Sequence, residues 1–154
     1  MKSLLKITLI VTFMLAGALS TAIAQRTIEM IGTDNMKFSV TSIEAEAGEE
    51  ITIKLTTKSQ IPKMAMAHNV VVIDKDADVG AVAQASMQAR DNDYISPEYK
   101  DEIVAATGLA GGGETVEVTF TVPEEPGNYE YICSFPGHFQ AGMKGVLTVR
   151  EAAS

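Results

Sequence analysis

The stretch YEYICSFPGHFQAGM, residues 129–143, decides the fold of this chain. Its first residues alternate between large and polar side chains, a pattern typical of a half-buried strand, and Pro136-Gly137 then indicates a turn. A single loop after the strand therefore carries the thiol of Cys133, the imidazole of His138 and the thioether of Met143. The 154-residue chain has one cysteine and two histidines, and the other histidine, His68, stands at the start of a second apolar segment.

Much of the remaining chain has the pattern of short strands. Apolar, β-branched and aromatic residues alternate with polar ones over residues 51–55 and 116–122, and residues 146–149 form a last apolar segment. Glycine- and proline-containing turns at 47–49, 111–113 and 126–128 separate these segments. This spacing predicts an all-β fold, a β-sandwich with Greek-key connections.

Residues 76–105 interrupt the strand pattern. Asp78 is suited to cap a helix in which apolar residues recur at helical spacing. Ser96-Pro97-Glu98 indicates a second helix start, and residues 102–107 fit either a helix or a strand. We expect a small helical insertion at about 76–105, packed outside the sandwich.

The N-terminal segment has the features of a cleavable signal peptide. Lys2 and Lys6 precede an apolar run over 9–19, and Ala22-Ile-Ala24 matches a small-residue cleavage site. The run is short for a membrane anchor, which needs about 20 apolar residues. We therefore expect a signal peptide at 1–24, a periplasmic domain at 25–154 and no stable membrane anchor. Without 1–24, ten basic residues face twenty acidic ones, and a charge of −10 argues against nucleic acid as a partner.

The ligand types in the loop favour one metal. Taken singly, Cys133 would more often be a core cysteine, His138 a loop histidine and Met143 a gap-filling side chain. Together with His68 they form a His₂CysMet set. Thiolate and thioether exclude hard cations such as calcium and magnesium, and structural zinc prefers more cysteines or histidines. The set is typical of a type 1 (blue) copper site holding one copper ion.

The same residues resemble a known family. Residues 127–149 and 66–70 are similar to the ligand segments of cupredoxins of the azurin and auracyanin group, and residues 93–97 and 112–120 resemble azurin's insertion. The similarity covers about residues 28–150. It implies a cupredoxin domain with His68, Cys133 and His138 as equatorial ligands, Met143 as the weak axial ligand and the Ala67 carbonyl opposite it.

The resemblance also implies roles for neighbours of the ligands. Asn69 would tie the two ligand segments together near Ser134, and the backbone N–H groups of Asn69 and Phe135 would donate to the cysteine sulfur. Two of the chain's departures from azurin concern the axial positions of the site. Four residues separate His138 from Met143, the longer auracyanin-like spacing, and Ala67 stands where azurins usually have glycine.

The expected function is that of a periplasmic one-electron carrier. The resemblance implies that redox partners such as a cytochrome or a copper enzyme dock near His138, on an apolar patch formed by Met66, Phe135, Gly137 and Ala141. The alternative is a copper chaperone or resistance protein, for which Met30, Met36, Met64 and Met66 would be metal ligands. An enzyme with a second copper site would need further histidines, which the chain lacks, so we expect no enzyme.

Overall fold

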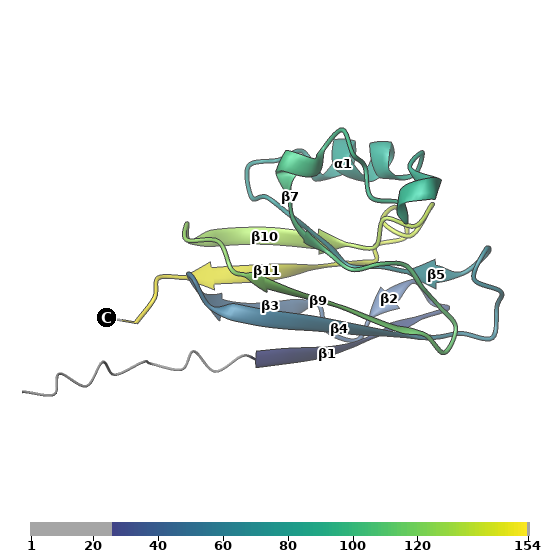
Figure 1. Ribbon diagram of the computed structural model, residues 1–154, viewed down its shortest axis with the longest axis horizontal. Coiled ribbons are helices and arrows are strands. Elements are labelled where there is room, and N and C mark those ends of the chain that lie inside the picture. The colour runs from purple at the N-terminus through teal and green to yellow at the C-terminus, as the bar shows by residue number, and fades with distance from the viewer. Residues whose placement is uncertain (1–25, 154) are drawn as a thin grey trace, which may run out of the picture.

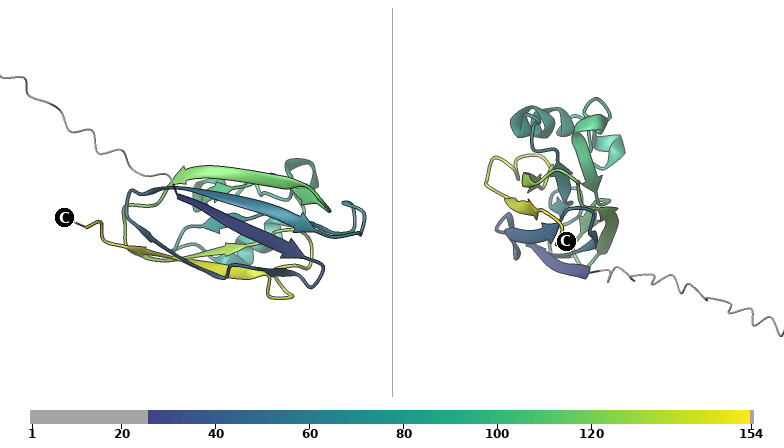
Figure 2. Two further views of the ribbon diagram at one scale, coloured as in Figure 1. Left: turned by 90° about the horizontal axis from the view of Figure 1, so that it is seen from below. Right: turned by 90° about the vertical axis from the view of Figure 1, so that its left-hand side faces the viewer.

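Two β-sheets lie face to face, and their edges are seen in Figure 2. The structure, a computed structural model, describes residues 26–153, so the predicted signal peptide lies outside the described residues. The first sheet has the order β2-β1-β4-β9, with β2 (Lys37–Phe38), β1 (Arg26–Thr33), β4 (Glu50–Lys58) and β9 (Thr115–Thr121). The second has the order β3-β11-β10-β6-β7, with β3 (Ser42–Glu46), β11 (Lys144–Arg150), β10 (Gly127–Ile132), β6 (Val71–Ile73) and β7 (Ile103–Ala106).

The chain crosses repeatedly between these two layers. Strands β1 and β4 are parallel neighbours, although β3, which lies between them in the sequence, belongs to the other sheet. Strand β3 in turn pairs in parallel with the last strand, β11. Such crossings are what distinguish a sandwich from a simple meander. The predicted all-β sandwich is confirmed.

The core between the sheets follows from the predicted alternation. Ile51, Ile53 and Leu55 of β4 are fully buried, and Leu147 and Val149 of β11 belong to the same apolar cluster. The side chains of a strand alternate between its two faces, so one face of each of these strands supplies the core. The strands expected at 51–55, 116–122, 129–131 and 146–149 are all present.

The insertion forms a flap over the outer face of the second sheet, where Figure 1 shows it above β10. Helix α1 (Val79–Ser86) begins at Asp78, whose carboxylate accepts a hydrogen bond from the Ala81 N–H at 3.0 Å. Val82 and Ala83 of α1 pack on Val71, Ile73 and Ile132 in a second apolar cluster. Strand β6 is thus buried on both faces.

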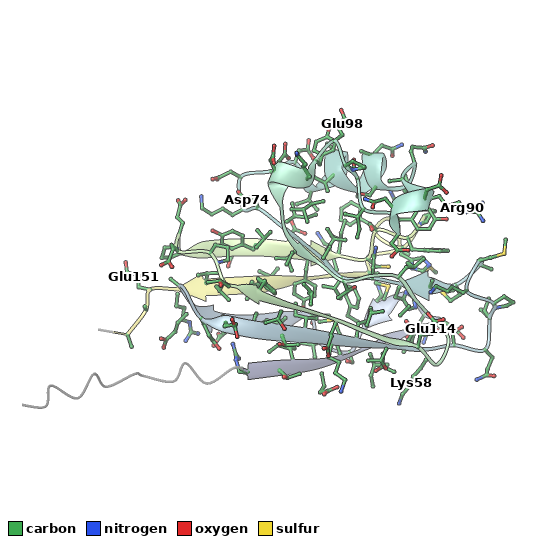
Figure 3. The ribbon with its side chains drawn as sticks, viewed as in Figure 1. Lys58, Asp74, Arg90, Glu98, Glu114 and Glu151 are labelled. Atoms are coloured by element: carbon green, nitrogen blue, oxygen red, sulfur yellow. The ribbon has the colours of Figure 1, made fainter. Side chains whose placement is uncertain are left out.

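The end of the insertion differs from the expectation. The helix predicted to start at residues 96–98 was wrong. Two short 3₁₀ helices flank this stretch, η1 (Arg90–Asn92) before it and η2 (Lys100–Glu102) after it, and Figure 3 labels Arg90 and Glu98 on the insertion. The ambiguous stretch 102–107 is largely strand β7, which pairs with β6 from Ile103 onward. That pairing leaves too few residues after Pro97 for a helix. Among the described residues, no helix has the length and apolar character needed to span a membrane.

Candidate metal centre

Four predicted ligands come from three places at one end of the sandwich. His68 lies in β5 (Ala67–His68), a short strand paired with β8 (Ala110–Gly111), and Figure 1 shows β5 at the end toward which β10 points. Cys133 directly follows β10, His138 lies in the next turn, and Met143 directly precedes β11. All four side chains are buried, with His138 the most exposed at 3%.

Three donor atoms converge on one point. The two histidine Nδ1 atoms lie 3.2 Å apart, and the Cys133 sulfur lies 3.8 Å from Nδ1 of His68 and 3.4 Å from Nδ1 of His138. A point in the plane of this triangle is equidistant from all three atoms at about 2.0 Å, which matches an ordinary metal–imidazole bond and is about 0.3 Å shorter than an ordinary metal–thiolate bond. Among the described residues, this is the one His/Cys/Asp/Glu group spaced to hold a metal. The donors therefore fit a trigonal metal site.

The ligand loop is held by its own backbone hydrogen bonds. The Cys133 N–H donates to the Met143 carbonyl at 3.0 Å, and the Met143 N–H donates to the His138 carbonyl at 2.9 Å. The His138 N–H donates to the Phe135 carbonyl at 3.0 Å. Gly137 has φ +84°, a left-handed conformation in which glycine is favoured. The backbone of Met143 is therefore tied to the backbones of both Cys133 and His138.

Asn69 joins the His68 segment to the ligand loop. Its side-chain oxygen accepts from the Ser134 N–H at 2.9 Å, and its amide donates to the Ser134 hydroxyl oxygen at 2.9 Å and to the Asp93 carbonyl at 2.9 Å. The Ser134 hydroxyl also donates to the Tyr94 carbonyl. Asn69 is fully buried, so these bonds satisfy a group that would otherwise be costly to bury.

Burial changes the acid–base properties of the donors. It raises the pKa of the Cys133 thiol to about 12, although the backbone N–H groups of Asn69 and Phe135 interact with the sulfur and oppose this rise. Burial and the neighbouring His68 lower the pKa of His138 to about 4, and burial also lowers the pKa of His68. Both imidazoles are thus neutral at pH 7 and present lone pairs to a metal. No described residue offers Nε2 of His68 a hydrogen bond of normal geometry.

The residues around the ligands are mostly apolar. The Phe135 ring lies 4.8 Å from the His138 ring, centroid to centroid, and 5.1 Å from the Tyr94 ring. Met66 and Phe135 are buried, whereas Gly137 and Ala141 of the expected docking patch are exposed. Ala67 is buried and pairs with Gly111 in the β5–β8 ladder.

The methionines proposed for a copper chaperone do not form one open cluster. Met30 is buried in the core, and Met36 packs against that core. Met66 is buried with 9% exposure, and Met64 is 81% exposed. The described structure therefore offers no specific support for an open methionine-rich site.

Two residues that contact the site were not anticipated from the sequence. A Cβ atom on Gly32 of β1 would lie 2.6 Å from Cδ2 of the His68 ring, so this position admits only glycine at its present spacing. The Lys37 ammonium donates to the carbonyls of Ala141 and Gly142 in the ligand loop. The only sequence signal was the glycine itself, which is rarely informative without a structure.

Comparison with known proteins identifies related chains. Residues 25–150 match the family model described as copper binding proteins, plastocyanin/azurin family. The chain is 41% identical over 124 residues to azurin from Alcaligenes faecalis, covering 78% of this chain and 94% of that protein. It is 36% identical over 117 residues to auracyanin-A from Chloroflexus aurantiacus, covering 75% of this chain and 68% of that protein. Among solved structures, the blue copper protein auracyanin A superposes with a TM-score of 0.72 at 33% identity, covering 82% of this chain and 99% of that chain.

Proposed function

Because the chain belongs to the plastocyanin/azurin family of copper-binding proteins, we propose that it is a periplasmic blue copper protein that carries one electron at a time between redox partners. The observation that carries the proposal is the donor triangle of His68, Cys133 and His138, whose edges measure 3.2–3.8 Å. These three residues would hold the copper ion, and Met143 would be its weak fourth ligand. The Ala67 carbonyl lies next to His68 in the chain as a candidate for a further weak contact.

The donor set suits both oxidation states of copper. Bound copper supplies a one-electron couple, since thiolate and thioether are ligands for Cu(I) and imidazole is a ligand for Cu(II). The protein contributes a fixed arrangement of donors. Asn69 locks the two ligand segments together, and the loop hydrogen bonds hold Met143 between Cys133 and His138. A site that moves little between oxidation states has a small barrier to electron transfer.

The surface near His138 supports electron exchange by docking. His138 is the one ligand with measurable exposure, at 3%, and exposed Gly137 and Ala141 flank it in the loop. Phe135 packs on its ring. We infer that a cytochrome or a copper enzyme docks on this face and that electrons pass through the His138 ring. The predicted signal peptide supports the periplasmic location.

Loading with copper tests the proposal. The purified copper-free protein is titrated with Cu(II), and we expect an intense thiolate-to-copper band in the visible spectrum at one equivalent. Cys133→Ser removes the thiolate and should abolish the band, whereas Met143→Leu should keep the band and shift the reduction potential. Met64→Leu is the matched control, because Met64 is exposed outside the loop and should change neither property. A colourless wild-type product would refute the proposal.

A further inference from the structure

The β1–β2 hairpin contacts both halves of the metal centre, although it supplies none of the four proposed ligands. Its two strands pair Gly32 with Phe38 and Thr33 with Lys37. The turn between them is closed by a hydrogen bond from the Met36 N–H to the Thr33 carbonyl at 2.9 Å, with Met36 in a left-handed conformation. The hairpin is also anchored to the first sheet, because β1 pairs with β4 over its whole length. Strand pairing therefore attaches the hairpin to the sandwich.

One strand of the hairpin lies against His68. Gly32 brings the β1 backbone so close to the imidazole that an added Cβ would lie 2.6 Å from Cδ2 and 2.9 Å from Cγ. The ring cannot move toward β1 from its present position. The backbone of Thr33 also interacts electrostatically with the same ring.

The other strand reaches the ligand loop. The Lys37 ammonium donates to the Ala141 carbonyl at 2.8 Å and to the Gly142 carbonyl at 3.1 Å. These carbonyls belong to the two residues directly before Met143, in the four-residue connection that follows His138. Gly142 has φ +85°, and the amide N–H groups of Ala141 and Gly142 already bond within the loop, to Gly137 and Phe139. The hydrogen bonds from Lys37 therefore connect the Ala141 and Gly142 carbonyl groups to the sandwich.

We propose that Lys37 is a positioning residue, a latch that ties the His138–Met143 connection to the β1–β2 hairpin and thereby fixes Met143 relative to His68. This inference deepens the proposed function, on which its copper readout rests. A connection of this length has room to move unless something outside it holds it, and hydrogen bonds from a charged donor are stronger than those between neutral groups. The ammonium also adds a positive charge beside the site, which favours Cu(I) over Cu(II).

The first test uses the copper-free protein, so it does not depend on the proposed function. Amide hydrogen exchange is measured for Ala141, Gly142 and Met143 in the wild type and in Lys37→Met. Loss of two charge-assisted bonds at an exposed site should speed exchange of these amides about tenfold. Amides of β4 should keep their wild-type exchange, which shows that the variant is folded. Exchange of the loop amides within twofold of the wild type would overturn the proposal.

Lys144→Met is the matched control for charge. Lys144 directly follows Met143, and its ammonium bonds to Glu130 at 2.9 Å and lies 5.8 Å from the centroid of the Phe139 ring, without a bond to a loop carbonyl. It should leave the loop amides protected, and Lys37→Arg should restore much of the protection. Equally faster exchange of the loop amides in Lys37→Met and Lys144→Met would mean that the loss of a positive charge alone speeds exchange. That result would overturn the proposal.

The second readout is the copper-loaded protein. Lys37→Met should lower the reduction potential by more than Lys144→Met does and should broaden the visible band, because Met143 is less well fixed. Identical potentials in the two variants would contradict the inference. If no variant and no wild-type sample shows a thiolate band, the proposed function fails, and the hydrogen-exchange result still decides whether Lys37 is a latch.

Discussion

Replacing Gly32 by alanine should damage copper binding without unfolding the protein. The new Cβ would stand 2.6 Å from Cδ2 of His68, whereas ordinary contacts begin near 3.4 Å, so strand β1 and the ring must separate by about 0.8 Å. His68 is fully buried, so a ring displaced by the new Cβ has to press against the groups packed around it. A displacement of this size is large beside a metal–nitrogen bond of about 2.0 Å.

The expected loss has two parts that separate experiments can measure. Overpacking at a buried site typically costs about 1–3 kcal/mol of unfolding free energy, which urea denaturation of the copper-free protein would report. Disturbing the orientation of a metal-binding histidine typically lowers metal affinity about 10–100-fold. We therefore expect competition with a copper chelator to show at least a tenfold weaker site, together with a shifted thiolate-to-copper band.

Gly108→Ala is the matched control for this substitution. An added Cβ there would meet its nearest atoms, on Asp93 and Val116, at 3.5 and 3.9 Å, which are ordinary contacts. It should leave copper affinity and the spectrum unchanged. If Gly32→Ala retained wild-type affinity and spectrum in a folded protein, the His68 ring would not be positioned by β1, and the reasoning from this close approach would be refuted.

Three further substitutions test other contacts. Asn69→Ala leaves the Ser134 N–H without its partner and removes one of the two partners of the Ser134 hydroxyl, so it should lower the melting temperature, at a cost of about 2–4 kcal/mol; an unchanged melting temperature would contradict the cross-link. Gly145→Ala places a Cβ 2.2 Å from Cζ of Tyr131 and should destabilise the fold by about 1–3 kcal/mol in urea; a neutral result would show that the ring moves freely. Burial and nearby carboxylates raise the pKa of Tyr129 above its usual 10.0, so the unfolded chain ionises first and stability falls as pH rises above 10. Tyr129→Phe should make that alkaline fall shallower in pH-dependent denaturation, and an identical slope would argue against it.

The sequence predicted the strands well where one face of a strand is buried. Ile51, Ile53 and Leu55 alternate with polar residues, and this alternation is a local signal that needs no knowledge of the partner strands. Residues 102–107 stayed ambiguous because β7 is decided by its pairing with β6, which lies some thirty residues away in the chain. The helix predicted after Ser96 does not form for the same reason, because pairing with β6 makes the chain a strand from Ile103 onward.

The residues of the metal centre also form two groups, those that the sequence indicates and those that only the tertiary structure reveals. Cys133, His138 and Met143 stand in one loop, and their chemistry shows in the sequence. Gly32 and Lys37 are ordinary residues by type, and they matter only because β1 and β2 lie against His68 and the loop. Nothing local distinguishes Lys37 from another exposed lysine. Such supporting contacts follow from tertiary packing, so a single sequence does not reveal them.

The distance along the chain between the two histidines has a consequence for folding. His68 and His138 are 70 positions apart, yet their Nδ1 atoms lie within 3.2 Å. Closing so long a loop is entropically unfavourable until other contacts compensate for it, so the donor triangle forms late, after the sheets have paired. A copper ion captured earlier would meet at most the cysteine and one histidine. During refolding in the presence of copper, the time at which the visible band appears would therefore report when the native topology is complete.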